Sequence, residues 1–145
     1  MCAMTTSVLH APPKRIHRPD VTVMEQATAD ELPEIQKLWP SFERLVGLRG
    51  RKMYGRADVK ANTYTACTPI KDDDRPDELG LRTGVLPGGW YLRGDLVGEP
   101  PGIFEKIGPG MAELEGAGPV DHGRPLVEFY RRNDIIELWV PVFPA

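Results

Sequence analysis

The sequence predicts an α+β fold in which two main helices pack against a mostly antiparallel sheet. Short runs rich in β-branched and aromatic residues recur along the chain and are separated by polar turns, which is typical of strands. Two longer segments instead space their apolar residues at helical intervals. The order is strand, helix, strand, strand, then strand, strand, helix, strand, strand. The two halves therefore look alike in content, although no sequence repeat is visible.

The first helix is expected over residues 32–46, after a short alternating strand at residues 21–24. One face of this segment is apolar and consists of Leu32, Ile35, Leu38, Trp39, Phe42, Leu45 and Val46. This pattern predicts that Trp39 belongs to the core. Thr28 and Glu31 have the spacing of a capping box, and Pro40 should bend or interrupt the helix because it removes a backbone donor.

The remaining strands are predicted from their composition. They cover residues 52–57, 62–70, 81–86, 90–96, 125–130 and 135–142. The second helix is expected between Pro100 and Glu115 and should be broken into two short pieces at Gly108-Pro109-Gly110. Ile103, Phe104, Ile107, Met111 and Leu114 should form its buried face. A polar turn at residues 131–134 links the last two strands.

Length and composition predict a single domain over residues 20–145, preceded by a flexible segment or loose first strand at residues 1–19. Hydrophobic residues make up 41% and charged residues 27% of the chain, as in ordinary globular proteins. The net charge of −3 gives no general attraction to nucleic acid or anionic membranes. No apolar stretch is long enough to span a bilayer. Two cysteines, Cys2 and Cys67, favour a reducing, cytoplasmic location over a disulfide scaffold.

Glu128 is the most informative residue because it lies in the middle of an aromatic, β-branched strand. Strand alternation places Glu128 and Tyr130 on one face, and it groups Glu137 with Trp139 in the next strand. In a cleft, a desolvated carboxylate has a raised pKa and can hold a cation or activate water. On the surface, Glu128 would pair with Arg131 or Arg132, and Glu137 has the same alternative of a solvated position.

Other motifs point to no cofactor and no metal. His10, His17 and His122 have no zinc-ligand spacing with one another or with Cys67. Gly88-Gly89 is a turn signal without the pattern of a phosphate-binding loop. Ser7 and Ser41 do not lie in a nucleophile elbow.

Four segments together resemble the GyrI-like (gyrase-inhibitor-like) small-molecule-binding family, which is related to the effector-binding domains of multidrug-responsive transcription activators. They are Tyr54-Gly55, the run from Leu86 to Tyr91 leading to Gly94, the helix from Ile103 to Leu114, and the ending from Pro125 through Glu128 and Tyr130 to Val142. Two departures are Trp90, where the family often has a small residue, and the glycine-broken second helix. The bulk of Trp90 should narrow or flatten the cleft.

The resemblance implies a pseudo-two-fold pair of strand-helix-strand-strand modules with a central, aromatic-lined cleft and an acid at its base. The expected ligand-binding residues are Glu128, Trp90, Tyr54, Tyr64, Tyr130 and Trp139, and the ligand is expected to be an aromatic or cationic small molecule. Stacking and cation–π contacts with such rings are worth roughly 1–2 kcal/mol each. The family's DNA-reading segment is missing from this sequence, so direct DNA binding is not expected.

Three functions follow from these observations. The first is a stand-alone protein that captures ligands against Glu128. The second is a cofactor-independent hydrolase that adds water to strained or reactive molecules, such as cyclopropanoids, for detoxification or self-resistance; its catalytic residues would be Glu128, Tyr64 and Glu137. The third, a contact with DNA gyrase, is suggested by the family name alone and ranks last.

Overall fold

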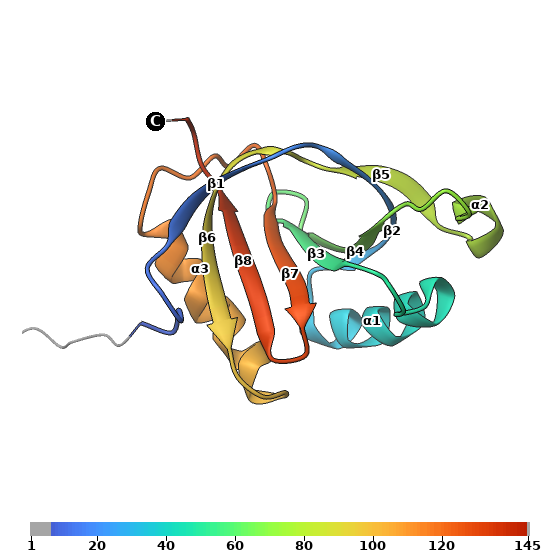
Figure 1. Cartoon of the computed structure of the whole chain (residues 1–145), viewed down its shortest axis with the longest axis horizontal. Coiled ribbons are helices and arrows are strands. Elements are labelled where there is room, and N and C mark those ends of the chain that lie inside the picture. The colour runs from blue at the N-terminus through green and yellow to red at the C-terminus, as the bar shows by residue number, and fades with distance from the viewer. Residues whose placement is uncertain (1–6, 145) are drawn as a thin grey trace, which may run out of the picture.

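A computed structural model of the chain describes residues 7–144 and contains one eight-stranded antiparallel sheet. The strands are β1 (Lys14–Arg18), β2 (Val21–Ala29), β3 (Met53–Asp58), β4 (Thr63–Pro69), β5 (Arg82–Leu86), β6 (Gly89–Val97), β7 (Leu126–Arg132) and β8 (Ile135–Pro141). Their order across the sheet is β1-β6-β8-β7-β3-β4-β2-β5. The sheet curls into a half-barrel, with β1, β2 and β5 arching over its top in Figure 1. The α+β prediction is confirmed.

The sheet is built from two equivalent modules. In the first, β2, α1 (Leu32–Val46), β3 and β4 give the strand order β2-β4-β3. In the second, β6, α3 (Ile107–Glu115), β7 and β8 give the order β6-β8-β7. The modules meet where β3 pairs with β7, and β5 and β1 extend the outer edges of the first and second modules respectively. The predicted pseudo-two-fold arrangement is therefore present.

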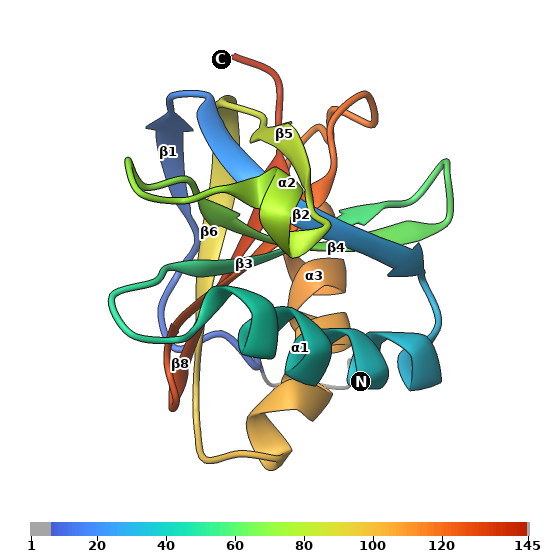
Figure 2. The same ribbon diagram turned by 90° about the vertical axis from the view of Figure 1, so that its right-hand side faces the viewer.

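Both main helices lie on the same side of the sheet, as Figures 1 and 2 show. Helix α1 buries Leu38, Phe42 and Val46 in a core that includes Met24 and Tyr64. Helix α3 packs Met111 and Leu114 against β6 and β8. A third apolar cluster fills the opposite, inner face of the curled sheet and includes Val23, Tyr54, Cys67, Leu86, Tyr91, Val127 and Trp139.

Glycines bring α3 close to the sheet. A Cβ on Gly110 of α3 would lie 2.6 Å from Leu138 Cδ1, and a Cβ on Gly94 of β6 would lie 3.2 Å from Leu114 Cδ2 of α3. The second helical segment has two pieces, the 3₁₀ turn η1 (Gly102–Lys106) and α3, but the predicted position of the break is wrong, because α3 runs through Gly108-Pro109-Gly110 without interruption. Phe104 of η1 was expected in the core but is 49% exposed.

Several local predictions need correction. The capping-box prediction is wrong, because Thr28 lies within β2 and the N-cap residue Glu31 makes no side-chain capping bond. Pro40 does not interrupt α1, which runs as one helix through it. A four-residue helix, α2 (Pro76–Leu79), lies between β4 and β5, where no helix is predicted. For Thr28, pairing of β2 with β4 prevailed over the local capping signal.

The N-terminal segment contains the edge strand β1, which pairs with β6. This corresponds to the loose first strand considered above, while Cys2 lies outside the described residues. Among residues 7–144, no helix has the length and apolar character needed to cross a membrane.

Candidate functional site

Glu128 lies where the two modules meet. Its strand, β7, pairs with β3 so that Glu128 is opposite Gly55. Gly55 makes room for the groups around the carboxylate: a Cβ at this position would overlap the Tyr64 hydroxyl and lie 3.0 Å from Glu128 Oε1. A strand glycine commonly marks such a close approach. The sequence Tyr54-Gly55 is thus structurally coupled to Glu128.

Two tyrosines hold one oxygen of the Glu128 carboxylate. The hydroxyls of Tyr64 and Tyr130 donate to Glu128 Oε1 at 2.8 and 2.6 Å. The indole N–H of Trp39 donates to the Tyr64 hydroxyl at 3.1 Å, which orients that ring. The other carboxylate oxygen, Oε2, has no hydrogen-bond partner within residues 7–144. The site therefore fixes the carboxylate and leaves one oxygen for a ligand or water.

Burial raises the pKa of Glu128 above its ordinary value, because a charged carboxylate loses hydration in this position. The hydrogen bonds from Tyr130 and Tyr64 oppose this shift, and the negative charge of Asp30 adds to it. Burial also raises the pKa of both tyrosines well above the usual range, so they remain protonated donors at neutral pH. The cluster therefore contains one acid and two hydroxyl donors.

A cavity of about 540 Å³ opens over this cluster, between α1 and the η1–α3 segment. Its floor is formed by Tyr64, Glu128 and Tyr130, and its walls consist of Leu32, Ile35, Gln36, Trp39, Pro40, Glu43, Phe104, Ile107 and Gly108. The ring of Trp39 meets that of Tyr130 edge-on, with their centroids 5.1 Å apart. We call this cavity the central cleft. Its size is in the range of small-molecule sites.

Three of the predicted site residues lie on the opposite face of the sheet. Glu137 pairs in register with Phe129, the neighbour of Glu128, so its side chain points to the inner face. There Trp139 donates its indole N–H to Glu137 Oε1 at 3.1 Å. Tyr54 stacks on Phe129 with centroids 4.7 Å apart and also contacts Trp139. The structure therefore does not bring Glu137, Trp139 or Tyr54 to the central cleft.

Trp90 also lies away from the cleft. It is at the start of β6, where its ring meets that of His17 at a centroid distance of 5.0 Å and the guanidinium of Arg15 at 5.1 Å. Both partners come from the edge strand β1. Trp90 thus does not narrow the central cleft, contrary to the expectation drawn from its departure from the family pattern.

Sequence reasoning missed several cleft residues. Trp39 was assigned to the core because an apolar helix face cannot distinguish a residue facing the sheet from one facing a cleft. Glu43 lies one helical turn after Trp39, and its position beside this apolar face was the available signal. Phe104 lines the cleft from the opposite wall. No local pattern marks Phe104 as a cleft residue.

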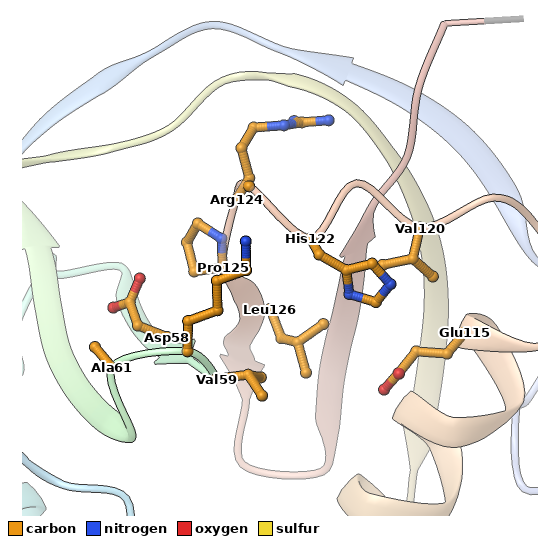
Figure 3. Close-up of a pocket in the computed structure, with 11 residues that line it drawn as sticks. Asp58, Val59, Ala61, Glu115, Val120, His122, Arg124, Pro125 and Leu126 are labelled. Carbon is orange, nitrogen blue, oxygen red and sulfur yellow. The ribbon is translucent and has the colours of Figure 1, made fainter.

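A separate hollow of about 390 Å³ lies near the β3–β4 turn and the segment after α3 (Figure 3). Figure 3 shows the Arg124 side chain extending away from the other labelled residues. Its guanidinium donates to the carbonyls of Gly88, Trp90 and Val142 and to Asp121. Arg124 is therefore occupied in joining loops to strand ends, and the central cleft is the stronger candidate site.

Comparisons with known proteins are informative at the level of the fold. No protein-family model matches the chain, and no curated protein matches its sequence. An integron cassette protein from the mobile metagenome of Vibrio cholerae is 17% identical, with a TM-score of 0.72 over 90% of this chain and 95% of that chain. A protein solved with bound tetraphenylphosphonium is 13% identical, with a TM-score of 0.61 over 92% and 94%.

A hydrolase from Listeria innocua is also similar in structure, at 13% identity and a TM-score of 0.53 over 92% of this chain and 94% of that chain. At these identities the likeness concerns the fold alone. The fold is consistent with the GyrI-like resemblance. The same architecture thus occurs in a protein crystallised with a cationic ligand and in a hydrolase.

Proposed function

We propose that this protein binds small aromatic cations in the central cleft, with Glu128 as the counter-charge. The observation that carries the proposal is a half-buried carboxylate held by two tyrosine hydroxyls on the floor of an aromatic-walled cavity. No lysine, arginine or histidine occurs among the described residues that line this cavity. A bound cation would supply the missing charge.

The energetics favour a cation with a large apolar surface. Desolvation disfavours the bare carboxylate, so a positive ligand gains from restoring its charged form. The rings of Trp39, Tyr64, Tyr130 and Phe104 offer cation–π and stacking contacts, which tolerate variation in ligand shape. The bound state of one structural neighbour, with tetraphenylphosphonium, supports the same ligand class for this fold.

Tetraphenylphosphonium and tetraphenylborate make a matched test because they have nearly the same shape and opposite charges. We expect the wild type to bind the phosphonium and Glu128→Gln to lose about tenfold in affinity, as expected for a charge-assisted contact. The borate should bind the Gln variant at least as well as the wild type. Glu115→Gln is the control, since this exposed residue lines the separate hollow. Equal phosphonium affinity in all three proteins would refute the proposed role of Glu128.

Hydrolysis is a second candidate, favoured by the free Oε2 of Glu128. In this reaction Oε2 takes a proton from water as the water oxygen bonds to an electrophilic ring carbon. The strained ring bond breaks, its electron pair goes to the leaving atom, and that atom receives the proton from Glu128. The net change is addition of one water. Tyr64 and Tyr130 keep the carboxylate in position, and Glu137 takes no part because it lies on the other face.

Turnover distinguishes the two candidates. The protein is incubated with an excess of a cyclopropane- or epoxide-bearing alkylator, and the products are followed by mass. Ring-opened product that carries one added water, exceeds the protein in amount and is lost in Glu128→Gln would establish hydrolysis. Phosphonium binding without such product would leave ligand capture as the function.

A further inference from the structure

A second hollow of about 410 Å³ lies next to the central cleft. The two hollows share four lining residues, which are Trp39, Glu43, Phe104 and Tyr130. The second hollow also extends to Leu48, Arg51, Met53, Arg132, Asn133 and Ile136. We call the two hollows together the groove: Glu43 lines both of them, and Glu128 lines the central cleft alone.

Glu43 is a second acid in this groove. Its side chain is half-buried on α1 and makes no hydrogen bond or ion pair with the described part of the chain. Burial raises the pKa of its carboxyl. Unlike Glu128, it has no tyrosine hydroxyls holding it in place. A carboxylate in this position gains from any positive group that enters the groove.

The basic residues of the groove do not neutralise Glu43. Arg51 forms a two-point ion pair with Asp74, with both distances 2.6 Å, and donates to the Val46 carbonyl. Its charge is therefore already compensated. Arg132 is exposed at the far end, where solvent screens its charge. The section shared by both hollows contains an acid and no base among the residues described.

We propose that Glu43 is a specificity-determining residue and that the preferred ligands are elongated aromatic dications, with one positive group at Glu128 and the other at Glu43. This inference rests on the proposed function, since it extends the same site. The apolar rings of Trp39 and Phe104, which line both hollows, would pack against the aromatic body between the charges. A zwitterion is the alternative, but its anionic end would have only the solvated Arg132 as a free partner.

A pair of linear probes tests this inference. One is a bis-benzamidine whose rings are joined by a flexible five-carbon diether, and the other has one amidine replaced by a neutral carboxamide. We expect the wild type to bind the diamidine more tightly. Glu43→Gln should weaken diamidine binding by about tenfold and leave monoamidine binding within about twofold. Glu128→Gln should weaken the binding of both probes.

The control is Glu34→Gln, which changes a partly exposed acid on the same helix that does not line the groove and should alter neither affinity. Glu43→Lys provides a second variant and should repel the diamidine more than the monoamidine. Thermal unfolding confirms that each variant is folded. Equal weakening of both probes by Glu43→Gln, or no preference of the wild type for the diamidine, would overturn the inference. Monoamidine binding that is insensitive to Glu128→Gln would instead refute the proposed function itself.

Discussion

Glu128 and Glu137 belong to the same β-hairpin, but they lie on opposite faces of the sheet and have different partners. On the inner face, Glu137 is only 6% exposed and pairs with Arg93 at 3.3 Å and Arg131 at 3.6 Å. On the outer face, Glu128 has tyrosine hydroxyls as partners and no cation within the described chain. The protein neutralises one carboxylate internally and leaves the other for the cleft.

This contrast separates a structural acid from a candidate functional one. A buried carboxylate with arginine partners has its charge satisfied in the folded protein. A partly buried carboxylate with only neutral donors keeps an unfavourable charge that a ligand can compensate. Glu137 is buried and Glu128 is half-buried, but burial alone does not show whether a carboxylate is compensated. The charge of the neighbouring groups does show it, because Glu137 has arginine partners and Glu128 has only neutral hydroxyl partners.

The largest effect is expected from removing the charge of Glu137. Glu137→Gln should lower the free energy of unfolding by about 2–3 kcal/mol at pH 7, because it removes the buried negative charge that pairs with two arginines. The loss stays below that of a fully buried pair because Arg131 is 43% exposed at its side chain. Glu128→Gln is the matched variant and should cause no loss. Urea unfolding of both variants measures these losses. Equal destabilisation by the two substitutions would contradict the proposed difference between the two acids.

A smaller effect is expected from filling the space beside Glu128. Gly55→Ala places a methyl group against the Tyr64 hydroxyl, which must move away from the carboxylate. We expect a loss of about 1–2 kcal/mol in unfolding free energy, together with weaker phosphonium binding. Gly102→Ala is the control, because a Cβ there meets no atom within 4 Å and Gly102 does not line the central cleft. If both alanine variants bind equally well, close approach at Gly55 is not needed for the site.

The smallest effect concerns pH. Because burial raises the pKa of Glu128, the folded protein retains this proton to a higher pH than the unfolded chain. The group's favourable contribution to stability is therefore complete at acid pH and is lost as the pH rises through its folded pKa. Glu128→Gln should thus melt slightly higher than the wild type at pH 7, with the difference closing below about pH 4. A wild type that is the more stable protein at pH 7 would show that Glu128 is internally compensated.

Local sequence patterns predict features that depend on residues close together in the chain, such as the face of a strand on which a side chain lies. Alternation within a strand correctly placed Glu128 with Tyr130, and Glu137 with Trp139, since successive side chains point to opposite faces. It did not reveal whether two strands present their acids to the same face. That depends on register: Phe129 pairs with Glu137, so the two glutamates point in opposite directions. The capping-box prediction is wrong because Thr28 pairs with Tyr64 of β4 and therefore belongs to strand β2.

The amino-acid sequence determined the order of the main strands and helices and the faces of single strands, because these follow from periodicity and from the turn preferences of glycine and proline. Only the tertiary structure decided which side chains share a site. It brought Tyr64 and Trp39 to Glu128, and it directed Tyr54, Trp139 and Glu137 to the inner face. The physical reason is that pairing between distant strands sets the register and curvature of the sheet. Register and curvature then decide which residues from distant parts of the chain meet at one site.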